Sequence, residues 1–122
     1  MKILALDIGT RRTGVAFVDT ANGIPLPLDT ILSESTEELV SHIHQIADER
    51  GVEKIVIGLP LLLSGDEGSQ SGYVRECAAM IEQSGLQIHF VDERYTTGAS
   101  AEYDGDARVA CGLLTTFLER MK

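Results

Sequence analysis

The 122-residue chain is poor in positive charge and in cysteine. Ten Lys and Arg against nineteen Asp and Glu give a formal net charge of −9. This balance argues against a cationic surface that holds nucleic acid or anionic lipid by charge alone. A polyanionic substrate would have to be met by local basic groups or metal ions. The two cysteines, Cys77 and Cys111, lack CxxC spacing, so we interpret them as buried thiols in a reducing compartment rather than as a disulfide.

Long apolar runs are also missing. No run approaches the ~20 residues that a membrane-spanning helix needs, and Asp7 interrupts the first apolar run before the apolar region of a signal peptide would be complete. We therefore expect a soluble, cytoplasmic protein. The hydrophobic fraction of 43% is typical of a globular domain, and the length fits one domain over residues 1–122, with no internal repeat or linker.

The N-terminal part of the sequence predicts strands followed by a helix. Two β-rich runs, residues 3–7 and 13–18, are separated by a basic turn and indicate a hairpin. Residues 24–32 are expected to form a third strand at a sheet edge, because their two prolines cannot donate to a β-ladder. The capping-box pattern from Ser35 to Glu38 then predicts a helix that ends at Gly51.

The C-terminal part alternates strands and helices. Residues 54–60 form a continuous apolar run, typical of a central parallel strand covered on both faces. A polar loop follows, in which Asp66 and Glu67 are expected to be solvated, and then a helix that ends near Gly85. Residues 88–91 predict the last strand, and the last helix begins at Asp104 or Asp106. This order predicts an α/β fold with a sheet of mixed direction.

Acidic residues stand where two of these strands end. Asp7 closes the first strand, Asp92 and Glu93 close the last, and Asp106 opens the helix that follows. Sites in open α/β sheets form at the carboxyl ends of strands. Converging carboxylates without histidine are ligands for Mg²⁺ or Mn²⁺ rather than zinc. The alternative is that each acid is a helix cap or a turn residue.

Several segments together resemble one known family. They read, in order, as a DxGxxRxGVA motif over residues 7–16, Gly58-Leu59-Pro60, a DERxTT motif over residues 92–97, and Asp106 followed by an apolar helix. These motifs are similar to those of the YqgF family, the Holliday junction resolvase-like nucleases of pre-16S ribosomal RNA. The resemblance implies a ribonuclease H-like fold, in which a five-stranded mixed sheet is flanked by helices, and phosphodiester hydrolysis that depends on Mg²⁺ or Mn²⁺.

The resemblance also assigns site residues by position. Asp7, Glu93 and Asp106 match the acids of the family site and are expected to be both metal ligands and catalytic residues. Glu93 is preferred to Asp92 for its family position and longer reach, because strand alternation places adjacent residues on opposite faces. Three arginines are expected to bind substrate phosphates: Arg11, Arg12 and Arg94. For Arg94, an ion pair with a neighbouring acid is the alternative.

One segment departs from the family pattern. Between Thr97 and Asp106 the chain is short and acidic, where family members carry a longer basic segment, and this leaves Asp104 as an alternative to Asp106. The expected function is a nuclease of structured nucleic acid, most simply at the 5′ end of pre-16S rRNA. The alternatives are a Holliday junction resolvase, which would act as a homodimer, and a non-catalytic ribosome-assembly scaffold. The expected partners are nucleic acid and ribosomal precursor particles. A sugar-kinase-like ATPase is disfavoured because such enzymes close two domains over the nucleotide.

Overall fold

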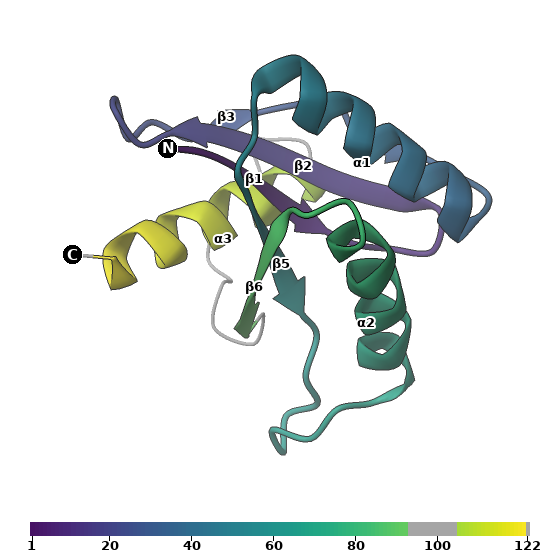
Figure 1. The fold of residues 1–122 in the computed structure, drawn as a ribbon. Helices are drawn as coiled ribbons and strands as arrows, with labels where there is room; N and C mark the ends of the chain where they lie inside the picture. The colour runs from purple at the N-terminus through teal and green to yellow at the C-terminus, as the bar shows by residue number, and fades with distance from the viewer. Residues whose placement is uncertain (93–104, 122) are drawn as a thin grey trace.

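A mixed β-sheet forms the middle layer of the fold, with two helices on one face and one helix on the other (Figure 1). The computed structural model describes residues 1–92 and 105–121. The strands are β1 (Lys2–Asp7), β2 (Arg12–Asp19), β3 (Leu26–Pro27), β4 (Ile31–Leu32), β5 (Lys54–Leu59) and β6 (Gln87–Asp92). The helices are α1 (Thr36–Arg50), α2 (Ser69–Glu82) and α3 (Gly105–Arg120). The strand order is β3-β2-β1-β5-β6, and β4 pairs with another part of β2.

Three neighbouring strands run in the same direction. β1 is antiparallel to β2 and parallel to β5, and β5 is parallel to β6. The strands β1, β5 and β6 therefore end at one rim of the sheet, at Asp7, Leu59 and Asp92 respectively. We call this edge the carboxyl rim. The opposite edge, which holds the first residues of these strands, is the amino rim.

The two faces of the sheet have separate cores, as strand alternation requires. On one face, Leu4, Leu6, Ile55 and Ile57 pack with the buried sides of α1 and α2. On the other, the sheet residues pack against α3; this α3-side core consists of Ile3, Ala5, Ala16, Val18, Val56, Val91, Ala110, Leu113, Leu114 and Phe117. The side chains of β5 are buried on both faces, which confirms the prediction of a covered central strand.

Helix α1 forms where the capping signals predicted it. The Ser35 Oγ accepts a hydrogen bond from the Glu38 backbone N–H at 3.1 Å, and Gly51 ends the helix in the left-handed conformation with φ of 66°. The Glu38 carboxylate accepts from the Glu34 N–H at 3.4 Å, one residue earlier than in a standard capping box. Local signals at both ends therefore define this helix.

The third strand was predicted incorrectly. Residues 24–32 form two short strands instead of one, and these pair with different parts of β2: Pro27 with Ala16 in β3, and Leu32 with Arg12 in β4. Proline has no N–H to donate, so a continuous ladder cannot pass through this segment. The sheet consequently has six strands rather than five, while the mixed direction and the flanking helices are confirmed.

Two expectations from composition can also be compared with the structure. Both cysteines are free thiols: Cys77 is buried and Cys111 is half-buried, and this desolvation raises the pKa of each thiol. In the part of the chain that the structure describes, no helix is long and apolar enough to cross a membrane.

Candidate active site at the carboxyl rim

Asp7 lies at the carboxyl rim, on the α3 side of the sheet. It is the last residue of β1, and it follows Ile3 and Ala5, which alternate into the α3-side core. Leu4 and Leu6 point to the other face, toward α1 and α2. The Asp7 side chain is only partly buried. A carboxylate is therefore held at the end of a buried strand and remains accessible from solvent.

The neighbouring strand has no side chain at the level of Asp7. Leu6 pairs with Ile57, so Asp7 is level with Gly58, and Gly58 pairs in turn with Val91 of β6. Val56 lies in the α3-side core, which puts Gly58 on the same face as Asp7. The strands β1 and β6 are two strand spacings apart, about 10 Å. Because Gly58 has no side chain, nothing on β5 separates groups that lie at the ends of β1 and β6 on this face.

Asp92 lies on the opposite face from Asp7. Ile88 and Phe90 pack against the core beneath α1 and α2, and Asp92 continues their alternation. Val91 belongs to the α3-side core instead. The structure thus places Asp92 and Asp7 on opposite faces of the sheet. Glu93 and Arg94 lie outside the described residues, as does Asp104.

The first turn of α3 lies toward the same rim. Near the other end of α3, the Phe117 ring is 4.8 Å from the His89 ring and 5.4 Å from the Lys54 Nζ, and Lys54 begins β5 at the amino rim. Asp106 precedes Phe117 by eleven positions, which correspond to about 16 Å of helix. Since β5 rises about 13 Å from Lys54 to Gly58, the start of α3 reaches the level of Asp7. The side chain of Asp106 is outside the described part of the structure.

The turn between β1 and β2 carries two of the predicted phosphate ligands. Arg11 and Arg12 are exposed, and they line an open pocket of about 470 Å³ together with Leu32, Ser33, Glu34 and Glu38. The turn is tight at Gly9, where an added Cβ would lie 2.4 Å from the Arg12 carbonyl oxygen. The close approach of the backbone, rather than a positive φ, requires glycine at this position.

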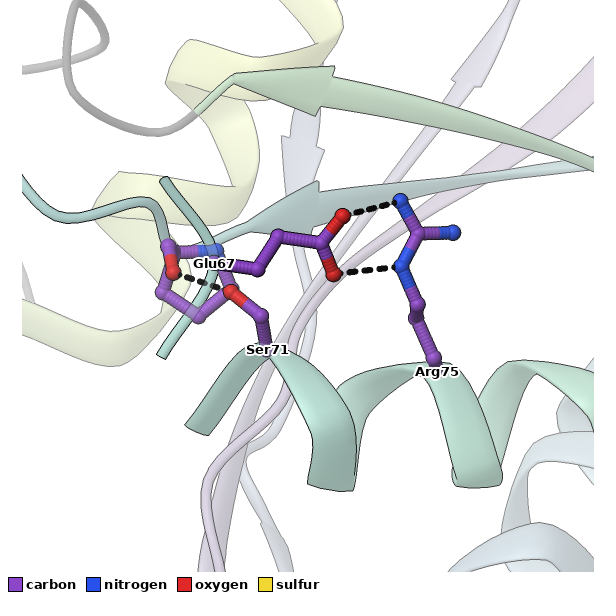
Figure 2. Close-up of polar contacts among 4 residues, drawn as sticks. Glu67, Ser71 and Arg75 are labelled. Carbon is purple, nitrogen blue, oxygen red and sulfur yellow. Dashed lines mark hydrogen bonds and ion pairs between the residues drawn. The ribbon is translucent and has the colours of Figure 1, made fainter. Parts of the chain in front are cut away.

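The loop after β5 contains contacts that the sequence did not indicate. Glu67, expected to be solvated, forms a two-pronged ion pair with Arg75 of α2, with Nε to Oε1 at 2.6 Å and Nη2 to Oε2 at 2.8 Å (Figure 2). Hydrogen bonding to Arg75 lowers the pKa of Glu67. Nearby, the Ser71 hydroxyl donates to the Pro60 carbonyl (Figure 2). Glu67 and Arg75 are eight residues apart, a spacing that matches no local side-chain pairing pattern, so their ion pair is recognised only in the folded loop.

Asp7 offers one donor of the kind that a hard divalent cation prefers. Asp7 supplies carboxylate oxygens, the donors that Mg²⁺ and Mn²⁺ prefer. None of the three histidines is near it in the sheet: His42 and His44 belong to α1, and His89 is the third residue of β6, toward the amino rim. Among the side chains that the structure describes, no three His, Cys, Asp or Glu groups lie close enough to hold a metal ion. Asp7 is thus the one acid of the predicted site whose side chain is described, and the roles of Glu93 and Asp106 stay predictions.

The chain is similar to curated bacterial proteins over most of its length. A protein of Chloroflexus aurantiacus named "Putative pre-16S rRNA nuclease" is 38% identical over 101 residues, which cover 82% of this chain and 66% of that protein. The chain thus spans just under two thirds of that relative. A protein of Chromobacterium violaceum with the same name is 37% identical over 110 residues, which cover 89% of this chain and 80% of the relative.

Solved structures with low sequence identity share the fold. Thermus thermophilus RuvC in complex with a Holliday junction substrate has a TM-score of 0.72 at 10% identity, and the match covers 99% of this chain and 96% of RuvC. The fowlpox virus resolvase with Holliday junction DNA has a TM-score of 0.63 at 12% identity, with 99% of each chain covered. These likenesses confirm the ribonuclease H-like fold class. The family model RuvX, described as Holliday junction resolvase, matches residues 1–118, and the chain therefore belongs to this family, the one that its motifs indicated under the name YqgF.

Proposed function

We propose that the chain is a divalent-metal-dependent nuclease that hydrolyses phosphodiester bonds in structured nucleic acid. The observation that carries this proposal is the position of Asp7 at the rim where β1, β5 and β6 end, on the face of the sheet that α3 covers. Family membership supports nuclease chemistry at this rim. Residues 1–122 would act as one catalytic domain, in the cytoplasm where ribosomal RNA is processed.

The proposed ligand set is Asp7, Glu93 and Asp106. Glu93 is proposed in preference to Asp92, because Asp92 lies on the face opposite Asp7. When bound, Mg²⁺ or Mn²⁺ supplies activation of water and neutralises charge on the scissile phosphate. Arg11 and Arg12 extend from the turn that follows Asp7, and with Arg94 they would orient the phosphates on either side of the reacting one.

For the substrate, we propose pre-16S rRNA, because the curated relatives are named as nucleases of that RNA, and the 5′ end is the cleavage position that we expect. A Holliday junction is the second candidate, favoured by the family description and by the two solved resolvases. Cutting two strands of a junction requires two active sites, so this alternative also requires a homodimer. Ribosomal precursor particles would be partners only in the first case.

A matched pair of variants tests the proposal. Asp7→Asn and Asp92→Asn each remove one negative charge at the carboxyl rim, on opposite faces of the sheet. With Mg²⁺ or Mn²⁺, Asp7→Asn should lower the rate of cleavage at least ~100-fold, by analogy with the loss of one charge-stabilising group. Asp92→Asn should change the rate less than ~3-fold, because Asp92 lies on the face of the sheet opposite Asp7. The measurement is gel-resolved cleavage of pre-16S RNA, duplex and four-way-junction substrates.

Four outcomes would contradict the proposal. Cleavage that survives Asp7→Asn, or that persists in EDTA, would exclude this metal-dependent mechanism. A greater loss in Asp92→Asn than in Asp7→Asn would place the site on the other face of the sheet. Binding of RNA without cleavage under any of these conditions would support the non-catalytic scaffold instead.

A further inference from the structure

The segment between β5 and α2 is a closed, hydrogen-bonded turn. Leu61 forms an isolated antiparallel bridge with Glu67, and inside it the Leu62 N–H donates to the Asp66 carbonyl at 2.9 Å. The Gly65 N–H donates to the Leu62 carbonyl at 2.8 Å, and Gly65 has a φ of 94°, which favours glycine. We call residues 61–67 the β5 hairpin. Its backbone has the bonding of a defined turn.

Side-chain contacts fix the base of the β5 hairpin to the rest of the fold. Arg75 binds both carboxylate oxygens of Glu67 (Figure 2). Its guanidinium carbon also lies 5.0 Å from the centroid of the Phe90 ring in β6. Ser71 holds the carbonyl of Pro60, where the hairpin leaves the sheet. Arg75 therefore connects the hairpin with α2 and with the last strand.

The end of this fixed hairpin is apolar and exposed. Leu62 is 54% exposed and Leu63 is 97% exposed. An added Cβ at Gly68 would lie 3.3 Å from Leu62 Cδ2, so the Leu62 side chain rests closely against the backbone of Gly68. The hairpin follows the last residue of β5 and extends past the carboxyl rim (Figure 1). The contacts that anchor the hairpin lie on the α2 side of the sheet, whereas Asp7 lies on the α3 side. The two leucines therefore lie beyond the end of β5, on a hairpin whose base is fixed to the face opposite Asp7.

We propose that Leu62 and Leu63 bind against the faces of unpaired bases in the nucleic acid that this rim cleaves. The inference rests on the proposed function and adds a substrate contact to it. Leucine is among the apolar side chains that proteins insert between bases. The nearest acid of the turn, Asp66, accepts a hydrogen bond from the Ser64 hydroxyl at 3.1 Å; its charge would repel a phosphate but has little effect on a base face.

A base suits this surface better than another protein does. A stable protein interface needs roughly 800 Å² from each partner, far more than two leucine side chains supply. An unpaired base is a flat apolar surface of matching size. The contact would also give affinity to a chain of net charge −9, which has few cations for phosphates.

The test is binding of a stem-loop RNA with 2-aminopurine in its loop, measured in EDTA so that no cleavage occurs. The variant Leu62→Ser/Leu63→Ser should bind about tenfold more weakly, the factor that corresponds to 1.4 kcal/mol. It should also lose part of the 2-aminopurine fluorescence change. The loss should be the same at every salt concentration, because no phosphate contact is removed.

Ile24→Ser is the matched control. Ile24 is 70% exposed, and it follows the end of β2, which pairs with the start of β1 at the amino rim. This variant should bind like wild type. A second pair of variants tests the hairpin base: Arg75→Gln should weaken binding, and the exchange Glu67→Arg/Arg75→Glu should restore part of it. If Arg75 only supported the fold of α2, the exchange Glu67→Arg/Arg75→Glu would not be expected to restore RNA binding.

Several results would overturn the inference. They are wild-type affinity in Leu62→Ser/Leu63→Ser, equal losses in that variant and in Ile24→Ser, or an affinity loss confined to low salt. If sedimentation shows that wild type self-associates and the leucine variant does not, the surface binds a second copy instead. If the wild type cleaves RNA and the leucine variant binds RNA with full affinity, the base contact is excluded and the nuclease function is not. If the wild type does not cleave RNA but the leucine variant still binds it tenfold more weakly, the nuclease function is excluded and the base contact is not.

Discussion

Replacing Gly9 with alanine tests whether the turn after Asp7 depends on backbone contact. An ideal Cβ at this position would lie 2.4 Å from the Arg12 carbonyl oxygen, whereas ordinary contacts begin at 3.4 Å. The obstructing atom belongs to the backbone, so no side-chain rotation relieves the overlap, and the turn must open by up to about 1 Å. Overpacking of this kind destabilises a protein by about 1–3 kcal/mol.

Urea and thermal unfolding measure this effect. For a domain of this size, each kcal/mol corresponds to a change in Tm of about 4 °C, so Gly9→Ala should lower the Tm by roughly 4–12 °C. Gly72→Ala is the control: Gly72 is exposed within α2, and an added Cβ there meets nothing within 4 Å. It should stabilise the protein by about 0.5–1 kcal/mol because alanine favours helix. A Gly9→Ala protein as stable as wild type would refute the close approach as the reason for this glycine.

Two further substitutions test the cap of α1 and the packing at the amino rim. Ser35→Ala removes the oxygen that accepts from the Glu38 N–H, and the free energy of unfolding in urea should fall by about 1 kcal/mol; an unchanged value would show that the cap contributes nothing. Burial, and then the positive charges of Lys54 and Arg120, lower the pKa of His89. The His89 imidazole therefore binds a proton more readily in the unfolded chain than in the folded one. As a result, the stability that neutral His89 provides is present above about pH 6.5 and is lost as the pH falls below that value. His89→Gln should reduce that acid-side loss in urea unfolding at several pH values, and an identical pH dependence in both proteins would contradict the assignment.

Helix α1 was predictable because its signals are local. Ser35, Glu38 and Gly51 are within a few residues of the backbone groups that they cap, so the pattern and the contact coincide. Helix α2 lacks such a signal: it begins at Ser69, and the preceding Gly68 offers no side-chain cap. The difference lies in whether a helix end is stabilised by neighbours along the chain.

Contacts between distant segments were not predictable. Residues 24–32 were interpreted as one strand, because their composition does not show that Pro27 and Leu32 pair with separate parts of β2. Similarly, Glu67 is a charged residue in a polar loop, for which a solvated side chain is the ordinary expectation. Its ion pair with Arg75 exists because the hairpin folds back over α2.

The candidate site was predictable to the extent that it depends on strand ends. Asp7 was expected at the carboxyl end of a buried strand, and the structure confirms that position. The structure adds which face each acid occupies: the sheet cores place Asp7 with α3 and Asp92 with α1 and α2. Sequence alternation separates adjacent residues in one strand, but it cannot relate the faces of two strands until their register is known. The pairing of Gly58 with Val91 provides that relation.

The net charge of −9 constrains how such a site can hold nucleic acid. Each phosphate contact changes the logarithm of affinity by about −0.9 per logarithm of salt concentration on duplex DNA. With Arg11, Arg12 and Arg94 as the proposed contacts, the slope would be about −3, much shallower than the slope of about −5 to −9 for proteins that make 6–10 such contacts. Phosphate contacts therefore supply only part of the affinity, and the acids elsewhere on the surface oppose it. The remainder must come from interactions that do not depend on positive side chains, and the two that we propose are cation binding at Asp7 and apolar contact at Leu62 and Leu63. Both proposed contacts are at or beyond the carboxyl rim, so this reasoning predicts that an acidic chain acts on a polyanion through contacts confined to that rim.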